Sequence, residues 1–211
     1  MVYASEVAGK KLTFQVSGKL WNRSLVMRDL ETGSLWSHIL GECMEGELVG
    51  KQLELIPALM TTWKQWLADH PGTTVLDMEP TAKRVGKNFY KDQRAFVYGV
   101  KAGGVAKAYS FAFLSANPVV QESLGGVNVL VTYDPASTSA MIFNTADLRF
   151  KPALEDGRLI ELGSGSQFDP ISGLATSGKL AGRQLEKLGG IVSYRKAWLV
   201  FYPESEVADP K

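Results

Sequence analysis

An internal repeat is the feature of this sequence that most constrains its fold. A shift of 132 residues aligns residues 31–75 with residues 163–207 without a gap. The densest match is the block Leu-x-Gly-x-Gln-Leu-Glu, at 48–54 and again at 180–186. The identical pairs include Gly33/Gly165, Ser34/Ser166, Gly41/Gly173, Gly46/Gly178, Gly50/Gly182, Leu53/Leu185, Trp66/Trp198 and Pro71/Pro203. Backbone geometry and packing demand glycine and large apolar residues at fixed positions, so we infer a duplicated structural unit.

The two copies of this unit are not equally long. Upstream of the gap-free match, Met1-Val2-Tyr3 aligns with Met141-Ile142-Phe143 after an eight-residue change of register. The second copy has a run-in from about Phe96 to Ala140 that the first copy lacks. We therefore expect lobes at 1–95 and 96–211, the first without the opening of its unit. A strand without its neighbour exposes a sheet edge, which predicts a covering partner such as a second chain in a homo-oligomer.

Glycine spacing favours strands over long helices in both lobes. The 21 glycines fall between short runs rich in β-branched and aromatic residues. Expected strands lie at 12–16, 24–30, 34–38, 96–100, 105–111, 127–133 and 140–143. Apolar residues at three-and-four spacing predict short helices within 61–70 and 193–202, each followed by a proline. The expected fold class is α+β and β-rich, with two related lobes of small antiparallel sheets that each carry one short helix.

Composition excludes several classes of function. The 23 basic and 22 acidic residues give a net charge of +1, which lacks the positive field of a non-specific nucleic-acid binder. Cys43 is the single cysteine and cannot form an internal disulfide. The chain has no long apolar run and no signal segment at Met1, so we expect a soluble cytoplasmic protein without membrane insertion. No Walker-type phosphate loop occurs, and no cofactor is expected.

The sequence also resembles a known protein family. The residues that carry this likeness include Leu12-Thr13-Phe14-x-Val16-Ser17-Gly18-Lys19-Leu20-Trp21-Asn22-Arg23-Ser24, Glu31-Thr32-Gly33-Ser34-Leu35-Trp36, His70-Pro71, Thr132-Tyr133-Asp134 and Ala197-Trp198. Through them the chain resembles the bacterial domain-of-unknown-function family 3179, which has no settled activity. The resemblance implies that longer members are secreted or envelope proteins whose preceding segment carries a Tyr-Cys-Pro-Leu-Cys motif. Here the nearest equivalent, residues 133–137, contains neither cysteine.

A group of polar and aromatic residues near the first lobe's hairpin is the leading candidate for a binding site. It consists of Ser17, Trp21, Asn22, Arg23, Asp29 and Trp36. Stacking and hydrogen bonding by such residues suit a small polar or sugar-like ligand, and the second copy shortens this stretch. The structural alternative places both tryptophans in the core, pairs Arg23 with Asp29 across the hairpin and assigns Asn22 to the turn.

An enzyme is the competing class of function. Cys43 or a serine, with His38 and Glu42, supplies the residue types of a hydrolase that acts on an ester, lactone or phosphoester. No Gly-x-Ser-x-Gly elbow accompanies them. His38 and Glu42 stand four apart, a spacing at which a helix could present two metal ligands, but the neighbouring glycines indicate a loop and no metal site is expected. The remaining histidine, His70, ends the first predicted helix, where capping or packing suits it.

Overall fold

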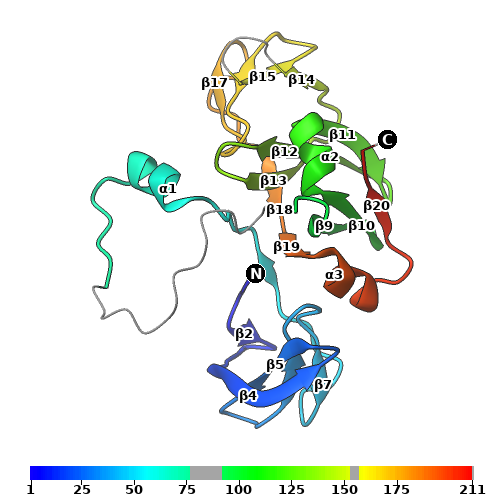
Figure 1. Ribbon diagram of the computed structural model, residues 1–211. Helices are drawn as coiled ribbons and strands as arrows, with labels where there is room; N and C mark the ends of the chain where they lie inside the picture. Colours follow the sequence, from blue (N-terminus) through cyan, green and yellow to red (C-terminus); the bar gives the residue numbers. More distant parts are fainter. Residues whose placement is uncertain (77–91, 153–156, 211) are drawn as a thin grey trace.

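The protein is β-rich and consists of several small, mainly antiparallel sheets with short helices (Figure 1). The computed structural model describes residues 1–76, 92–152 and 157–210. The strands of the first copy are β1 Val2–Tyr3, β2 Glu6–Val7, β3 Lys10–Lys11, β4 Phe14–Trp21, β5 Ser24–Asp29, β6 Leu35–Ser37, β7 Cys43–Glu45 and β8 Leu55–Ile56, followed by helix α1 Trp63–Asp69. The second copy contains β9 Phe96–Ala102, β10 Val105–Ser110, α2 Phe111–Ala116, β11 Val119–Leu124, β12 Val127–Asp134, β13 Ser139–Asn144, β14 Phe150–Pro152, β15 Leu159–Glu161, β16 Gln167–Phe168, β17 Ala175–Ser177, β18 Glu186–Leu188, β19 Gly190–Tyr194, α3 Arg195–Phe201 and β20 Glu206–Ala208.

Each copy contains a four-stranded antiparallel sheet of the same order, β4-β5-β6-β7 in the first and β14-β15-β16-β17 in the second. An edge-to-face ring pair recurs in both. Phe14 meets Trp36 with centroids 5.6 Å apart, and Phe150 meets Phe168 at 5.1 Å, both at 86°. Such pairs contribute specific packing energy beyond the area they bury. The aligned positions 36 and 168 therefore carry the same structural role.

The pairing of β1 also has an equivalent in the second copy. Val2 of β1 pairs with Ile56 of β8, and Ile142 of β13 pairs with Leu188 of β18. Positions 56 and 188 are 132 residues apart, so β1 corresponds to β13. In the second copy β13 lies between β12 and β18, whereas β1 pairs only with β8 among the described strands. Among the described residues, the other edge of β1 has no strand partner.

The run-in of the second copy contributes β9, β10, β11 and β12 to two further sheets, in the orders β19-β9-β10-β20 and β11-β12-β13-β18. In the first of these sheets β20 runs parallel to β10, whereas only antiparallel sheets were expected. Helix α2 packs against β9, β10 and β12, and its buried Phe111 and Leu114 join the core between the sheets. The Ser110 side chain caps the helix by accepting the Phe113 N–H at 3.1 Å. The sequence pattern predicts a strand that ends at residue 111 and does not predict this helix. The second copy therefore has one helix more than expected.

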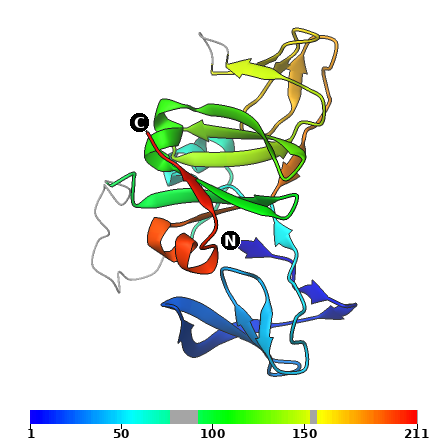
Figure 2. The same ribbon diagram turned by 90° about the vertical axis from the view of Figure 1, so that its right-hand side faces the viewer.

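The two copies meet where the β4–β5 hairpin approaches α3 (Figure 2). Trp21 at the end of β4 lies edge-to-face on Phe201 of α3, with centroids 5.1 Å apart and an interplanar angle of 84°. No strand pairing among the described residues joins the part before residue 95 to the part after it. The division into lobes at 1–95 and 96–211 stays a prediction. None of the helices in the described ranges is long and apolar enough to span a membrane.

Helices α1 and α3 have the same local structure and very different surroundings. The Trp66 Nε1 donates to Thr73 Oγ1 at 3.0 Å, and the Trp198 Nε1 donates to Ser205 Oγ at 2.8 Å. Trp198 packs on β9 and is 1% exposed, while Trp66 is 40% exposed. The sequence repeat therefore fixes the helix and its local hydrogen bond, while only the second copy provides the sheet that buries the indole.

This contrast gives a matched pair of substitutions. Trp198→Ala removes a buried aromatic side chain and should lower the free energy of unfolding by about 3–5 kcal/mol. Trp66→Ala removes an exposed one and should cost less than about 1 kcal/mol. Urea unfolding monitored by circular dichroism measures both changes, and equal losses would show that α1 is packed as tightly as α3.

Candidate functional site

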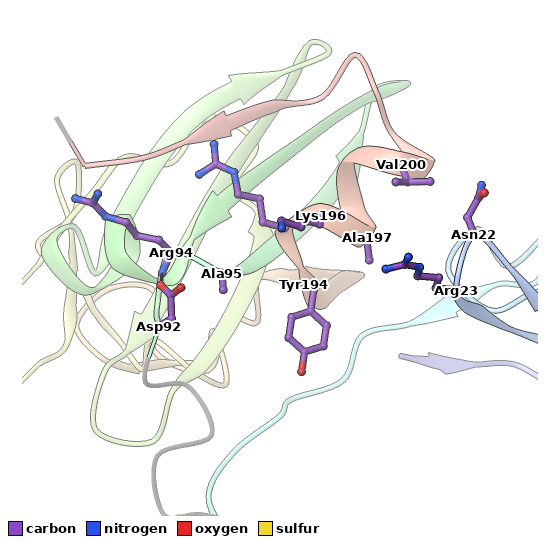
Figure 3. Close-up of a pocket in the computed structure, with 10 residues that line it drawn as sticks. Asn22, Arg23, Asp92, Arg94, Ala95, Tyr194, Lys196, Ala197 and Val200 are labelled. Carbon is purple, nitrogen blue, oxygen red and sulfur yellow. Dashed lines mark hydrogen bonds between the residues drawn. The ribbon is translucent and has the colours of Figure 1, made fainter.

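A cavity of about 840 Å³ lies between the tip of the β4–β5 hairpin and helix α3 (Figure 3). It brings together residues from both copies of the repeat. The lining residues are Asn22, Arg23, Asp92, Arg94, Ala95, Tyr194, Arg195, Lys196, Ala197 and Val200. A volume of this size is typical of small-molecule sites.

The hairpin reaches α3 because it is longer in the first copy. Strand β4 has eight residues, and its counterpart β14 has three. Trp21 pairs with Ser24, so Asn22 and Arg23 form a two-residue turn in which both φ angles are positive, at 49° and 64°. Such a turn favours asparagine and then glycine, and arginine at the second position carries strain of about 1–2 kcal/mol. Figure 3 shows the Arg23 side chain extending toward Ala197 of α3.

The charged residues that line the cavity are mostly cationic. Arg23, Arg94, Arg195 and Lys196 line it, against the single carboxylate of Asp92. Arg195 also forms an ion pair with Asp209. These groups create a local positive potential on a chain whose overall charge is only +1.

The other wall of the cavity is apolar. It is formed by Ala95 before β9, the Tyr194 ring, and Ala197 and Val200 on α3. The Tyr194 ring packs against Phe96 at a tilt of 35°, with centroids 4.7 Å apart, and this contact positions it beside the cavity. Apolar surface next to guanidinium groups suits a ligand that combines an anionic group with an apolar or aromatic part.

The structure separates the residues of the sequence-predicted binding cleft. Asn22 and Arg23 line the cavity, while Asp29 and Trp36 are fully buried. The Trp36 Nε1 donates to Asp29 Oδ2 at 2.8 Å. Asp29 and Trp36 therefore do not face a ligand, because they form the interior of the turn after β5. The sequence could not distinguish a ligand-binding role from a structural role, because arginine, aspartate and tryptophan around a turn suit both.

Ser17 and Trp21 also have structural contacts. The Ser17 Oγ donates to the Val26 carbonyl at 2.5 Å, where the β4–β5 register shifts. Trp21 is partly exposed and packs on Phe201 beside the cavity. The expected ion pair of Arg23 with Asp29 does not form, because the carboxylate is enclosed by Trp36 and the 32–34 turn. Trp21 therefore positions the hairpin tip that carries Arg23.

The residues of the hydrolase hypothesis do not converge. Glu42 and Cys43 line a second cavity of about 560 Å³ together with Trp21, but His38 is not among its lining residues. Burial raises the pKa of the Cys43 thiol, whose Sγ lies 3.5 Å from the Glu45 carbonyl. Burial and the N-terminal charge lower the pKa of His38. No hydrogen bond between the His38 side chain and Cys43 or Glu42 occurs among the described residues, and no group of three potential metal ligands forms there.

Sequence reasoning missed most of the cavity residues. Arg94 precedes β9, and Arg195 and Lys196 begin α3, far from Arg23 in the chain. One signal was present in the repeat: Tyr194 and Arg195 of the second copy replace Thr62 and Trp63 of the first. Only the tertiary structure shows that these diverged positions lie beside Arg23.

The fold and the cavity define this chain as a duplicated, β-rich protein with a cavity, lined by several cationic residues, between its two copies. The chain matches the family model described as protein of unknown function (DUF3179) over residues 1–93 and again over residues 78–211. The chain belongs to this family. The two matches agree with the duplication. No curated protein and no solved structure shows significant similarity to the chain.

Because the Asp29 carboxylate is buried and hydrogen-bonded, we expect the stability of the fold to decrease in acid. Burial by itself raises the pKa of this carboxyl, but hydrogen bonds from Trp36, Thr32 and Gly33 outweigh it and hold the pKa below its ordinary value of 3.8. A carboxyl group whose pKa is lower in the folded than in the unfolded protein stabilises the fold at pH values above its unfolded-state pKa. This stabilisation is lost as the pH falls through the folded-state pKa. Asp29→Asn should therefore destabilise the protein at pH 7 and show a smaller further loss of stability between pH 5 and pH 3 than the wild type.

Urea midpoints across this pH range measure the effect. Glu161 holds the equivalent place in the second copy, and hydrogen bonds from Ser164 lower its pKa as well. Glu161→Gln is therefore the matched variant, expected to behave in the same way. A pH profile for Asp29→Asn that parallels the wild type would show that the carboxylate does not stabilise the turn.

Proposed function

We propose that this protein is a binding module for a small anionic ligand that also carries an apolar group, held in the cavity between the β4–β5 hairpin and α3. One observation supports the proposal most directly: Arg23 occupies a strained turn position that glycine would fill at lower energy, and its side chain extends to the cavity. A residue in a sparsely populated backbone region often has a functional role.

The charge arrangement supports an anion in particular. Arg23, Arg94 and Lys196 line the cavity from three separate segments. Hydrogen bonds between such cations and a carboxylate or phosphate are shorter and stronger than neutral ones, at about 1.5–3 kcal/mol each. The Tyr194 ring and Val200 beside them provide surface for an aromatic or aliphatic part of the same ligand.

Phenyl phosphate is a suitable probe because it joins an aromatic ring to a dianionic group. We expect calorimetric titration to detect its binding, with affinity that falls as the salt concentration rises. Phenol, which lacks the phosphate, should bind far more weakly. Arg23→Gly should weaken binding of phenyl phosphate by about tenfold or more, since one charge-assisted hydrogen bond corresponds to at least a factor of ten.

Arg23→Gly also separates binding from folding. Glycine adopts the positive φ of this position without steric strain, so the variant should be at least as stable as the wild type. Lys179→Ala, which removes an exposed cation outside the cavity, should bind phenyl phosphate normally. Equal affinities for wild type and Arg23→Gly, or equal binding of phenol and phenyl phosphate, would overturn the proposal.

The hydrolase hypothesis has less support from the geometry. Its nucleophile candidate, Cys43, is buried, and burial raises its pKa, so little of the thiol is in the reactive thiolate form near neutral pH. We expect Cys43 of the native protein to react with a thiol reagent such as dithionitrobenzoate much more slowly than in denaturant. Reaction at the same rate in both states would show an accessible thiol and favour the enzyme.

A further inference from the structure

The second cavity, in which Glu42 and Cys43 lie, belongs to the sheet β4-β5-β6-β7 of the first copy. All four strands contribute to its lining, and its volume of about 560 Å³ is within the range of small-molecule sites. Much of the lining is apolar. It includes Leu20 and Trp21 of β4, Val26 of β5, Leu35 of β6 and Met44 of β7.

The strand pairing shows which residues of the second copy correspond to this lining. Met27 of β5 pairs with Trp36 of β6. Leu159 of β15 pairs with Phe168 of β16 in the same way, and both of these residues lie 132 positions further along the chain. The shift of 132 residues that relates β6 to β16 therefore also relates β5 to β15.

In the second copy a polar pair of side chains occupies two of the corresponding positions. Val26 corresponds to Arg158, directly before β15, and Met44 corresponds to Thr176 of β17. The Arg158 Nη1 donates to the Thr176 Oγ1 at 3.0 Å. The methylene groups of an arginine can cover apolar surface while its guanidinium group is hydrogen-bonded. The second copy thus has a cation on an aliphatic chain at a place where the first copy is apolar.

The charges on the first copy are complementary to such a group. Glu42 and Glu45 line the cavity, whereas the aligned residues of the second copy, Leu174 and Ser177, are uncharged. Within the ranges that the structure describes, neither glutamate takes part in an ion pair. Lys19 also lines the cavity, so two carboxylates against one ammonium give the lining a net negative charge.

We propose that the second cavity binds a small organic cation with an aliphatic chain, of which an alkylguanidinium is the simplest example. The chain lies against Val26 and Met44, and the cationic group donates hydrogen bonds to Glu42 and Glu45. The ligand then provides to the first copy the chemical group that Arg158 provides within the second. Charge-assisted hydrogen bonds from a guanidinium group to carboxylates are among the strongest in proteins. This site is separate from the cavity beside α3 and takes a ligand of the opposite charge.

Hexylguanidine, which is a cation at neutral pH, is a suitable probe. The chain has six methionines, so NMR of protein labelled with carbon-13 at the methionine methyl groups gives a simple spectrum in which Met44→Thr identifies the Met44 signal. We expect hexylguanidine to shift this signal in a saturable manner and to leave that of Met141, which is buried in the second copy, unchanged. Hexanol without the charge and methylguanidine without the chain should each bind about tenfold more weakly or less.

A double variant tests the carboxylates without changing what the scaffold accepts. Glu42→Leu combined with Glu45→Ser introduces the residues that the second copy has at these positions. It should weaken the binding of hexylguanidine by about tenfold or more, because one charge-assisted hydrogen bond corresponds to at least a factor of ten. Glu54→Gln, which removes an exposed carboxylate outside this cavity, is the matched control and should bind normally.

A second double variant fills the cavity from within. Val26→Arg combined with Met44→Thr transfers the side-chain pair of the second copy to the first. Calorimetric titration of this variant should detect no binding of hexylguanidine. Circular dichroism verifies that both double variants are folded.

Three outcomes would overturn the proposal. The absence of a saturable shift of the Met44 signal would show that the cavity does not take this class of ligand. Equal affinities for hexylguanidine and hexanol would show that it takes an uncharged apolar ligand instead. Wild-type affinity in folded Glu42→Leu/Glu45→Ser would show that the two carboxylates do not recognise the cation.

Discussion

The second copy of the repeat depends on one interaction. Helix α3 packs onto the strand pair β9–β10 through Trp198. Trp198 is buried because Gly99 has no side chain and allows the indole to lie on the backbone of β9. That contact links α3 to β19 and β20, and through β9 and β10 to the larger core around α2. Small sheets bury little area by themselves, so each needs such a cover to be stable.

The duplicated unit explains how this chain acquires a cavity that is lined by residues of both copies. In the second copy β14 and β15 have three residues each, whereas in the first copy β4 and β5 extend far enough for Trp21 to reach Phe201. The extension places the turn with Arg23 beside the start of α3, whose residues have diverged from those of α1. A cationic cavity thus arises from divergence at positions that the shared scaffold leaves free.

Several elements could be predicted from the sequence because their signals are local. Alternation and turn residues located the β9–β10 and β12–β13 hairpins, and three-and-four spacing located α1 and α3. Helix α2 was missed because its residues, Phe111–Ala116, are as apolar as a buried strand and carry no periodic polar face. For the site, Asn22 and Arg23 were identified from their turn, whereas the roles of Asp29 and Trp36 depend on burial, which a pattern of residue types does not reveal.

The sequence by itself determined the internal repeat, the strand-rich fold class and the turns at the matched glycines. These features follow from backbone geometry and from periodicities of a few residues. Only the tertiary structure decided that Trp66 and Trp198, identical in the alignment, have opposite surroundings. It also decided that Arg23 and Lys196 share one cavity. Both outcomes depend on contacts between residues far apart in the chain, and such contacts are set by how sheets and helices cover one another rather than by any local pattern.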